Sequence, residues 1–162
     1  RYNNVAYFIP MHCFDRDMLI LLHDVARMQR TRFDQWARNY GLTRAQGIIL
    51  HRLDRQPGLS QNEMAALCEV EPITVGRLVD RLEARGLLER RADPSDRRIR
   101  RLHLLPAAAP LIAAIQDYKA ALEDFMTEGL DQSVQETLID ALVHMKTKLV
   151  MEVEAPLKVA GE

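Results

Sequence analysis

Two helix-start signals follow one another closely in this chain, and they constrain its fold more than any other feature. Thr43-Arg44-Ala45-Gln46 and Ser60-Gln61-Asn62-Glu63 both have the S/T-x-x-E/Q form of a capping box, in which the first and fourth residues satisfy each other's backbone amides at the start of a helix. Gln56-Pro57-Gly58 stands between them and breaks helices. The sequence therefore predicts one helix from the first box to this break, and then a short, well-capped helix over 61–68.

A further helix and a hairpin are predicted directly afterwards. Pro72 suits the first turn of a helix, and Gly86 suits its end. One apolar stripe lies between them, formed by Val75, Leu78, Val79 and Leu82. The pattern then changes to two strand-like stretches, 87–91 and 98–105, around the polar turn Asp93-Pro94-Ser95-Asp96. These features predict a β-hairpin that carries arginines.

Longer helices are predicted on either side of this segment. The first extends from about Asp15 to Asn39, the fifth starts at Pro106, and the last begins near Asp131 or Ser133. In the fifth helix, apolar residues have the a/d spacing of a helix that packs along another helix: Leu111, Ile115, Tyr118, Leu122 and Phe125. The same stripe would also suit burial within one chain. The order of elements predicts a mainly α fold with a small β-hairpin wing, which is the arrangement of a winged helix-turn-helix.

The charge of the chain is balanced in total but uneven along its length. With 22 Lys and Arg against 23 Asp and Glu, the formal charge of −1 does not mark a general polyanion binder. Residues 77–101 nevertheless hold nine basic and five acidic side chains. Seven of the arginines are predicted on one edge: Arg77, Arg81, Arg85, Arg97, Arg98, Arg100 and Arg101. Clustered arginines gain affinity for a DNA duplex by releasing its counterions. The alternative interpretation is an ordinary solvated face.

Several other classes of protein are disfavoured. The seven glycines form neither a dinucleotide-binding nor a P-loop motif, and no nucleophile elbow occurs, so we expect no enzyme activity and no cofactor. The five histidines and two cysteines lack zinc-site spacing, so we expect no metal. No apolar run approaches the ~18 residues of a membrane span. Two cysteines are too few for a disulfide framework, which makes the cytoplasm the expected compartment.

Four stretches of the sequence carry a resemblance, and the last two are specific at this spacing: Leu42-Thr43-Arg44-Ala45-Gln46, Leu59-Ser60-Gln61-Asn62-Glu63-Met64-Ala65, Val79-Asp80-Arg81-Leu82-Glu83-Ala84-Arg85-Gly86-Leu87-Leu88 and Asp93-Pro94-Ser95-Asp96-Arg97-Arg98. In them the chain resembles the MarR-type winged-helix regulators, and among these the SlyA-like branch. The resemblance implies a DNA-binding winged lobe over 42–105 and a helical dimerisation lobe from 1–41 and 106–162. It also implies a homodimer whose two winged lobes each meet half of a pseudo-palindromic operator in double-stranded DNA.

For the hairpin, the resemblance implies a minor-groove contact. Arg98 is the second Arg of an Asp-x-Arg motif and is expected to enter the groove, where negative potential is concentrated. Arg97 and Arg100 are expected to contact DNA beside it. Asp96 either orients the Arg98 guanidinium as a bidentate partner or only caps the turn.

For the helix that enters the major groove, the chain departs from its relatives. SlyA-like relatives often have Ser near Ile73 and Arg near Gly76. We therefore expect this helix to make few direct contacts with base edges. Ile73 or Thr74 would touch a thymine methyl, and Arg77 would reach guanine or a phosphate. The amino end of the preceding helix would meet a phosphate. The full set of expected contacts on the two helices is Ser60, Gln61, Asn62, Pro72, Ile73, Thr74, Gly76, Arg77 and Arg81.

The resemblance also implies a signal that releases the DNA. Relatives are usually repressors that respond to a small molecule, often an aromatic acid, bound between the two lobes. Candidate contacts for such an effector are Trp36, Arg38, His51, Arg52 and Tyr118. Trp36 and Tyr118 also suit the core, and His51 also suits partial burial without a ligand.

The alternative signal is thiol oxidation at Cys13. The register argues against this signal, because the sensing position of the peroxide-responsive members aligns nearer Leu19. Cys68 follows Ala65-Ala66-Leu67 as a buried small residue would. We therefore expect both cysteines to be plain thiols.

Overall fold

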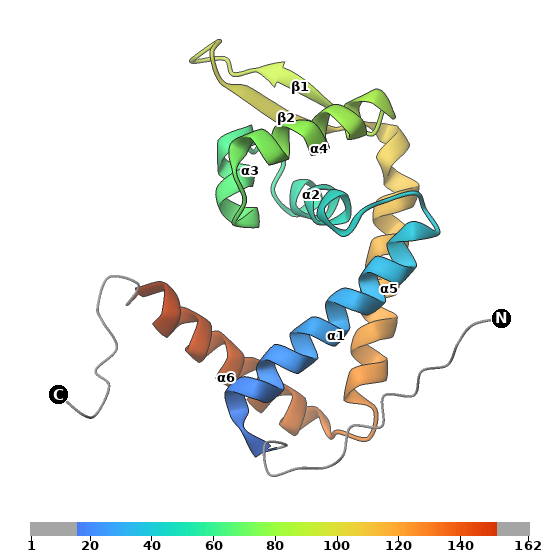
Figure 1. Cartoon of the computed structure of the whole chain (residues 1–162), viewed down its shortest axis with the longest axis vertical. Helices are drawn as coiled ribbons and strands as arrows, with labels where there is room; N and C mark the ends of the chain where they lie inside the picture. The colour runs from blue at the N-terminus through green and yellow to red at the C-terminus, as the bar shows by residue number, and fades with distance from the viewer. Residues whose placement is uncertain (1–15, 152–162) are drawn as a thin grey trace. The chain divides into compact units, whose positions relative to one another are not determined.

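The computed structural model describes residues 16–151. Its elements, in chain order, are α1 (Met18–Arg38), α2 (Arg44–Arg55), α3 (Gln61–Cys68), α4 (Pro72–Ala84), β1 (Leu88–Ala92), β2 (Arg100–Leu104), the short 3₁₀ helix η2 (Pro106–Ala108), α5 (Ala109–Thr127) and α6 (Gln132–Met151) (Figure 1). This mainly helical fold with one antiparallel hairpin confirms the predicted fold class, a winged helix-turn-helix.

Local hydrogen bonds explain why the central helices begin where they do. The Thr43 backbone amide donates to Oε1 of Gln46 at 3.0 Å, and the Gln46 amide donates to Oγ1 of Thr43 at 3.3 Å. The Ser60 amide likewise donates to Glu63 at 2.6 Å, and the Glu63 amide donates to the Ser60 hydroxyl at 3.2 Å. Both capping boxes are thus complete, and α3 has its predicted bounds. Each cap stabilises its helix by about 1 kcal/mol.

Two helix starts differ from the prediction. The carboxylate of Asp17 accepts from the amides of Leu19 and Ile20, so α1 begins at Met18 and not at Asp15. Pro106 opens a 3₁₀ turn, in which the Ala108 amide donates to the carbonyl of Leu105 at 2.9 Å, and α5 follows from Ala109. At each start the first backbone amides of the helix need a hydrogen-bond acceptor. The acceptors are the carboxylate of Asp17 for α1 and the carbonyl oxygen of Leu105 for the 3₁₀ turn.

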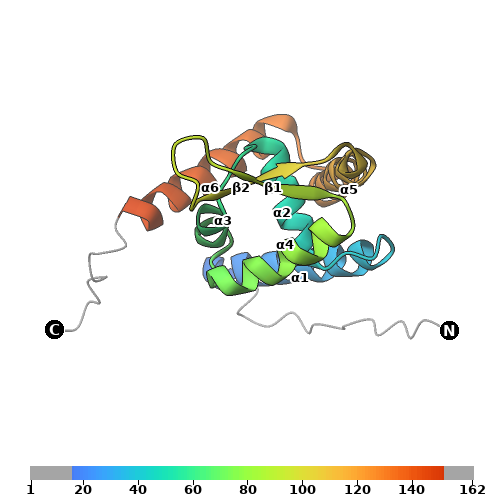
Figure 2. The ribbon, with the colours of Figure 1, turned by 90° about the horizontal axis from the view of Figure 1, so that it is seen from above.

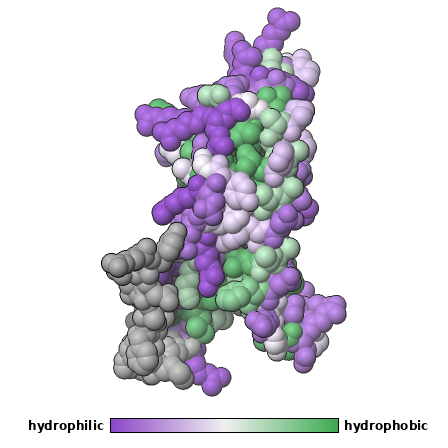
Figure 3. Space-filling view, turned by 90° about the vertical axis from the view of Figure 1, so that its right-hand side faces the viewer, coloured by the Kyte–Doolittle hydropathy of each residue, from purple (hydrophilic) through white to green (hydrophobic). Residues whose placement is uncertain are grey.

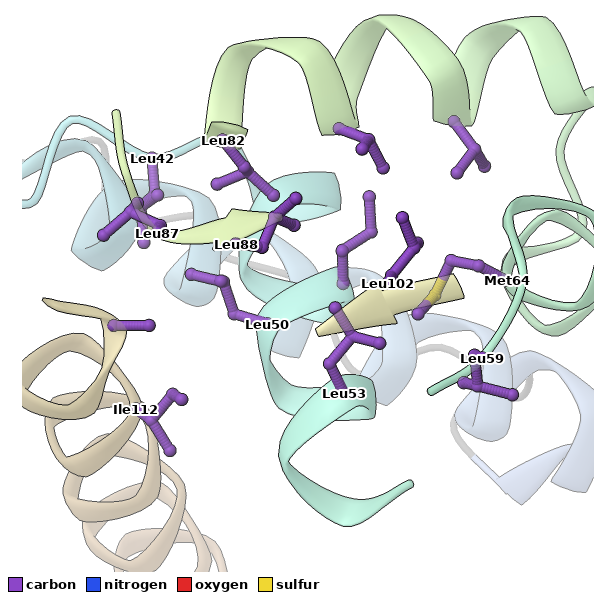
Figure 4. Packing of buried hydrophobic residues seen from close by; sticks show 14 of the residues in the cluster. Leu42, Leu50, Leu53, Leu59, Met64, Leu82, Leu87, Leu88, Leu102 and Ile112 are labelled. Carbon is purple, nitrogen blue, oxygen red and sulfur yellow. The ribbon is translucent and has the colours of Figure 1, made fainter. Parts of the chain in front are cut away.

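The chain divides into two compact units, residues 1–115 and 116–162, and each is described by itself. In the first unit α2 packs against α1, α3, α4 and the hairpin. Figure 4 shows Leu50 of α2, Leu82 of α4 and Leu88 of β1 pointing toward one another, and all three side chains are fully buried. The beginning of α5 joins this core through Ile112 and Ile115. The predicted apolar stripe of the fifth helix therefore starts as part of the core.

The hairpin has a regular register. Leu88 pairs with Leu104, Arg90 with Leu102 and Ala92 with Arg100. Gly86 turns the chain from α4 into β1 with a φ of +66°, a conformation that favours glycine. We call the hairpin, residues 88–104, the wing.

The second unit contains most of α5 and all of α6. None of the residues of α6 is buried in this single chain. Its apolar side chains are instead exposed, among them Val134, Leu138, Leu142 and Leu149. In the part of the chain that the structure describes, no helix combines the length and the apolar character needed to cross a membrane.

Candidate nucleic-acid interface

The two elements predicted to contact DNA are α4 and the wing, and the start of α4 and the turn of the wing lie on the same side of the first unit. Figures 1 and 2 show the turn of the wing at the end of the unit where α4 begins. Val75, Val79 and Leu82 bury one face of α4 completely. The opposite face is exposed and carries Pro72, Ile73, Thr74, Arg77 and Arg81. Ile73 leaves 66% of its surface exposed, which is unusual for an isoleucine.

Six arginines on α4 and the wing are exposed. One of them, Arg91, pairs with Glu89. The other five are Arg77, Arg81, Arg97, Arg98 and Arg100. Within residues 16–151, none of these five side chains forms an ion pair or a hydrogen bond. Figure 3 shows hydrophilic side chains projecting at the end of the molecule that carries the wing. The five guanidinium groups are thus available to phosphates or to base edges.

Two of the seven arginines predicted on this edge contact the protein itself. Arg85, just after α4, donates to the carbonyl oxygens of Gly41 at 2.9 Å and Tyr40 at 3.2 Å, which ties α4 to the turn between α1 and α2. Arg101 contacts Asp93, Glu63 and the carbonyl oxygen of Gly58. The predicted edge of seven arginines is therefore reduced to five.

An arginine that the sequence did not single out fixes the wing to α4. Arg90 of β1 contacts Glu83, donates to Oδ1 of Asp80 at 2.6 Å and donates to the carbonyl oxygen of Gly76 at 3.3 Å. Its backbone amide also donates to Glu83 at 3.1 Å. No local pattern marked Arg90, because all its partners lie on another element.

The turn of the wing is organised around a buried carboxylate. Asp93 is only 5% exposed, and its Oδ1 accepts from the amide of Ser95 at 2.7 Å and the Ser95 hydroxyl at 2.5 Å. The hydroxyl of Ser95 and the guanidinium of Arg101 hold the pKa of the Asp93 carboxyl well below its usual range. Asp-Pro-Ser is a turn signal in the sequence, but only the structure shows its carboxylate turned inward.

The two roles predicted for Asp96 are to orient the Arg98 guanidinium and to cap the turn. Its carboxylate accepts from the backbone amide of Arg98 at 2.9 Å and so caps the turn. Among the described residues, it forms no contact with the Arg98 guanidinium. No contact within the described residues therefore fixes the orientation of the Arg98 side chain.

The predicted contacts at the start of α3 differ in their availability. The Ser60 hydroxyl is occupied by its capping box, whereas Asn62 is exposed. The Gln61 side-chain amide donates to the carbonyl oxygen of Pro72 at 3.3 Å and lies over Gly76. A Cβ at Gly76 would lie 3.1 Å from Nε2 of Gln61. Gly76 thus leaves room for Gln61 to connect α3 with α4.

The candidate effector contacts are distributed over both units. Trp36 is half-buried, with its ring centroid 5.3 Å from that of Phe33 and 4.8 Å from that of Tyr40, so it belongs to an aromatic cluster formed by α1 and the turn after it. Arg38 and Arg52 are exposed, and His51 is half-buried. Tyr118 is half-buried on the part of α5 that belongs to the second unit. These positions leave the effector site a prediction.

Of the two cysteines, the structure describes Cys68. Cys13 lies outside the described residues. Cys68 is half-buried, with its Sγ 3.8 Å from Sδ of Met64. Burial raises the pKa of the Cys68 thiol, and the nearby charge of Arg52 offsets this only in part. A raised pKa lowers the fraction of reactive thiolate.

Known proteins are similar to the part of the chain that carries this surface. The profile of the MarR family matches residues 40–99, which include α2, α3, α4, β1 and the turn of the wing. A putative transcriptional regulatory protein for the hcr operon of Thauera aromatica is 32% identical over 112 residues, covering 60% of this chain. The match spans 66% of the length of that relative.

Solved structures agree over more of the chain. The transcriptional regulator PA3341 is 33% identical, with a TM-score of 0.73, and the match covers 80% of this chain and 96% of that structure. MepR of S. aureus, in a complex with DNA, is 25% identical with a TM-score of 0.69, and the match covers 80% of this chain and 96% of MepR. Both similarities extend well beyond the segment matched by the family profile.

Proposed function

From its similarity to MarR-family regulators, we propose that the chain is a member of this family, that it binds double-stranded DNA as a homodimer and that it represses transcription from a pseudo-palindromic operator. A small aromatic acid or a similar molecule would release the DNA. A regulator of this kind would act in the cytoplasm, with the DNA. The similarity of MepR, whose structure contains DNA, supports this proposal.

The observation that carries the proposal is the set of five exposed arginines on α4 and the wing that have no partner within residues 16–151. A folded protein rarely leaves clustered like charges uncompensated unless they serve binding, because the charges repel one another. A DNA duplex presents one negative charge per ~1.7 Å of its axis and would neutralise them.

We assign different tasks to the two elements. The wing, with Arg97, Arg98 and Arg100, would contact phosphates and place Arg98 in the minor groove. α4 would lie in the major groove, where Ile73 and Arg77 face the bases. The exposed Asn62 and the first amides of α3 would meet a phosphate.

The homodimer would be formed by residues 1–41 and 106–162 of each chain, with 42–105 as the DNA-binding lobe. Exposed apolar residues support this proposal in both units: Met18, Leu19, Leu22, Val25 and Met28 on α1, and Val134, Leu138, Leu142 and Leu149 on α6. Burial of such residues against a second chain would gain about 25 cal/mol per Å² of apolar surface.

The proposal also includes an effector and a branch of the family. Trp36, Arg38, His51, Arg52 and Tyr118 are the proposed contacts of an aromatic carboxylate, and the motifs over 42–98 favour the SlyA-like branch. Effectors of this kind typically change affinity by a coupling of about 1–3 kcal/mol, so the effector would weaken operator binding without abolishing it. The oxidation alternative would be removed if Cys13→Ser left the response to peroxide unchanged.

The proposed function is tested by the salt dependence of DNA binding. Fluorescence anisotropy with the DNA upstream of its own gene should show an affinity that falls steeply between about 50 and 200 mM salt. An affinity that does not change over this range would refute DNA binding through phosphate neutralisation.

The division of tasks is tested with three matched variants. Arg98→Ala should weaken binding to all sequences and reduce the salt slope by about one unit, whereas Arg77→Ala should also change the preference among sequences. Arg30→Ala removes an exposed arginine of α1 and should change neither property. If Arg98→Ala and Arg77→Ala behaved identically, the proposed tasks of wing and helix would be wrong.

A further inference from the structure

Arg101 differs from the other arginines of the wing because three separate segments hold its side chain. Its Nε contacts Asp93 in the turn of the wing. Its Nη1 donates to the carbonyl oxygen of Gly58, between α2 and α3, at 2.9 Å, and lies 3.6 Å from the carboxylate of Glu63 in the first turn of α3. One guanidinium thus joins the wing to the part of the chain where α3 begins.

The partners of Arg101 are themselves fixed. Asp93 also accepts from the amides of Ser95 and Asp96, so it determines the path of the turn that carries the exposed arginines. Glu63 accepts from the amide of Ser60, and Ser60 forms an isolated β-bridge with Arg101. A continuous set of contacts therefore connects the turn of the wing to the N-terminal cap of α3.

Strand geometry explains why neighbouring arginines have opposite environments. Successive residues of a strand point to opposite faces, so Arg100 is exposed while Arg101 faces Gly58 and Glu63. Arg101 is also directly opposite Arg91 in the hairpin register, which by itself is repulsive. Arg91 pairs with Glu89, and Arg101 pairs with Asp93, so each charge has its own carboxylate.

We propose that Arg101 is a positioning residue for DNA binding, which holds the arginine-bearing turn of the wing at a fixed place relative to the start of α3 and does not itself contact DNA. This inference rests on the proposed function. A wing held in this way reaches the minor groove at the same time as α3 and α4 reach the phosphates and the major groove. Without Arg101 the turn would be ordered only on binding, and that ordering would reduce affinity.

The proposal is tested by double-mutant cycles on the full chain, with anisotropy as the readout. Arg101→Gln should lower affinity, and it should also reduce the effect of Arg98→Ala by about threefold or more, because a displaced wing no longer uses Arg98. The effect of Arg77→Ala should stay unchanged in the Arg101→Gln background. Arg100→Gln, on the opposite face of the strand, is the matched control and should be additive with Arg98→Ala.

Arg101→Lys separates positioning from charge. Lysine keeps the positive charge but lacks the planar fork that reaches Asp93, Gly58 and Glu63 together, so it should not restore affinity. Restored affinity, or additivity of Arg101→Gln with Arg98→Ala, would mean that Arg101 is a phosphate contact. A lower melting temperature with unchanged affinity of the folded protein would mean a purely structural role. Either result would overturn the inference, whereas salt-independent binding of the wild-type protein would overturn the proposed function itself.

Discussion

At the scale of single residues, Ile73 and Gly76 give the proposed DNA-recognition surface of α4 an unusual chemistry. Ile73 is exposed in the first turn, and Gly76 has no side chain, so the side-chain amide of Gln61 lies over it. Neither residue can form a hydrogen bond to a base edge through its side chain. Apolar contact with a thymine methyl is the kind of base reading that remains for Ile73.

Replacement of thymine by deoxyuridine tests this reading, because the two bases differ only in the methyl group. We expect one or two thymines of each half-site to lose affinity on replacement, by about fourfold, the value of one buried CH₂. In Ile73→Ala protein the same replacements should have no effect. The measurement is anisotropy with singly substituted duplexes.

Thr74→Ala is the matched control for that experiment, since Thr74 is the other exposed side chain of the first turn with a methyl group, Val75 being buried. It should leave the discrimination between thymine and deoxyuridine unchanged. Discrimination that disappears with Thr74→Ala and persists with Ile73→Ala would assign the contact to Thr74.

At the scale of elements, the first turn of α3 has a structural role and also a proposed role in DNA binding. Its first turn contains the capping box, the contact of Glu63 with Arg101 and the exposed Asn62. Hydrogen bonds from Ser60 hold the pKa of the Glu63 carboxyl below its usual value, since they stabilise its charged form. The start of α3 is therefore fixed before any DNA arrives.

Comparison of two cap variants separates stability from binding. Ser60→Ala and Thr43→Ala each remove one capping hydroxyl and should each lower the free energy of unfolding by about 1 kcal/mol, as measured by urea denaturation. Only Ser60→Ala should also weaken DNA binding by the folded protein, because α3 and not α2 begins at the proposed interface. Equal losses of affinity in the two variants would contradict this placement of α3.

At the scale of the whole molecule, the exposed apolar side chains of α6 require an explanation. None of the 20 residues of α6 is buried in the single chain, whereas most helical stability in proteins comes from the packing of an apolar face. Leu138, Leu142 and Leu149 recur at helical spacing and are 47%, 41% and 71% exposed. A second chain would bury this stripe.

A charged substitution in the stripe should dissociate the proposed homodimer. We expect the wild-type protein to show twice the 18.6 kDa mass of the chain by light scattering. Leu142→Glu should shift the protein toward the single-chain mass and weaken binding to a full operator more than to one half-site. His144→Glu introduces the same charge at an exposed polar position of α6 and should remain dimeric. A dimeric Leu142→Glu protein would place the interface elsewhere.

The sequence by itself determined the features that depend on near neighbours. The capping boxes at Thr43 and Ser60, the proline that starts α4 and the positive φ at Gly86 involve residues a few positions apart. Helix order, the hairpin and the fold class followed from such signals together with apolar periodicity. Similarity of motifs then indicated the family.

Only the tertiary structure decided which arginines remain available. Arg77 and Arg85 have the same chemistry and the same helical spacing, yet only Arg85 reaches the carbonyl oxygens of Tyr40 and Gly41, more than 40 positions away in the chain. Arg101 and Arg90 were likewise decided by partners on other elements. The environment of a long charged side chain depends on which distant segment folding brings beside it, and local sequence patterns do not contain that information.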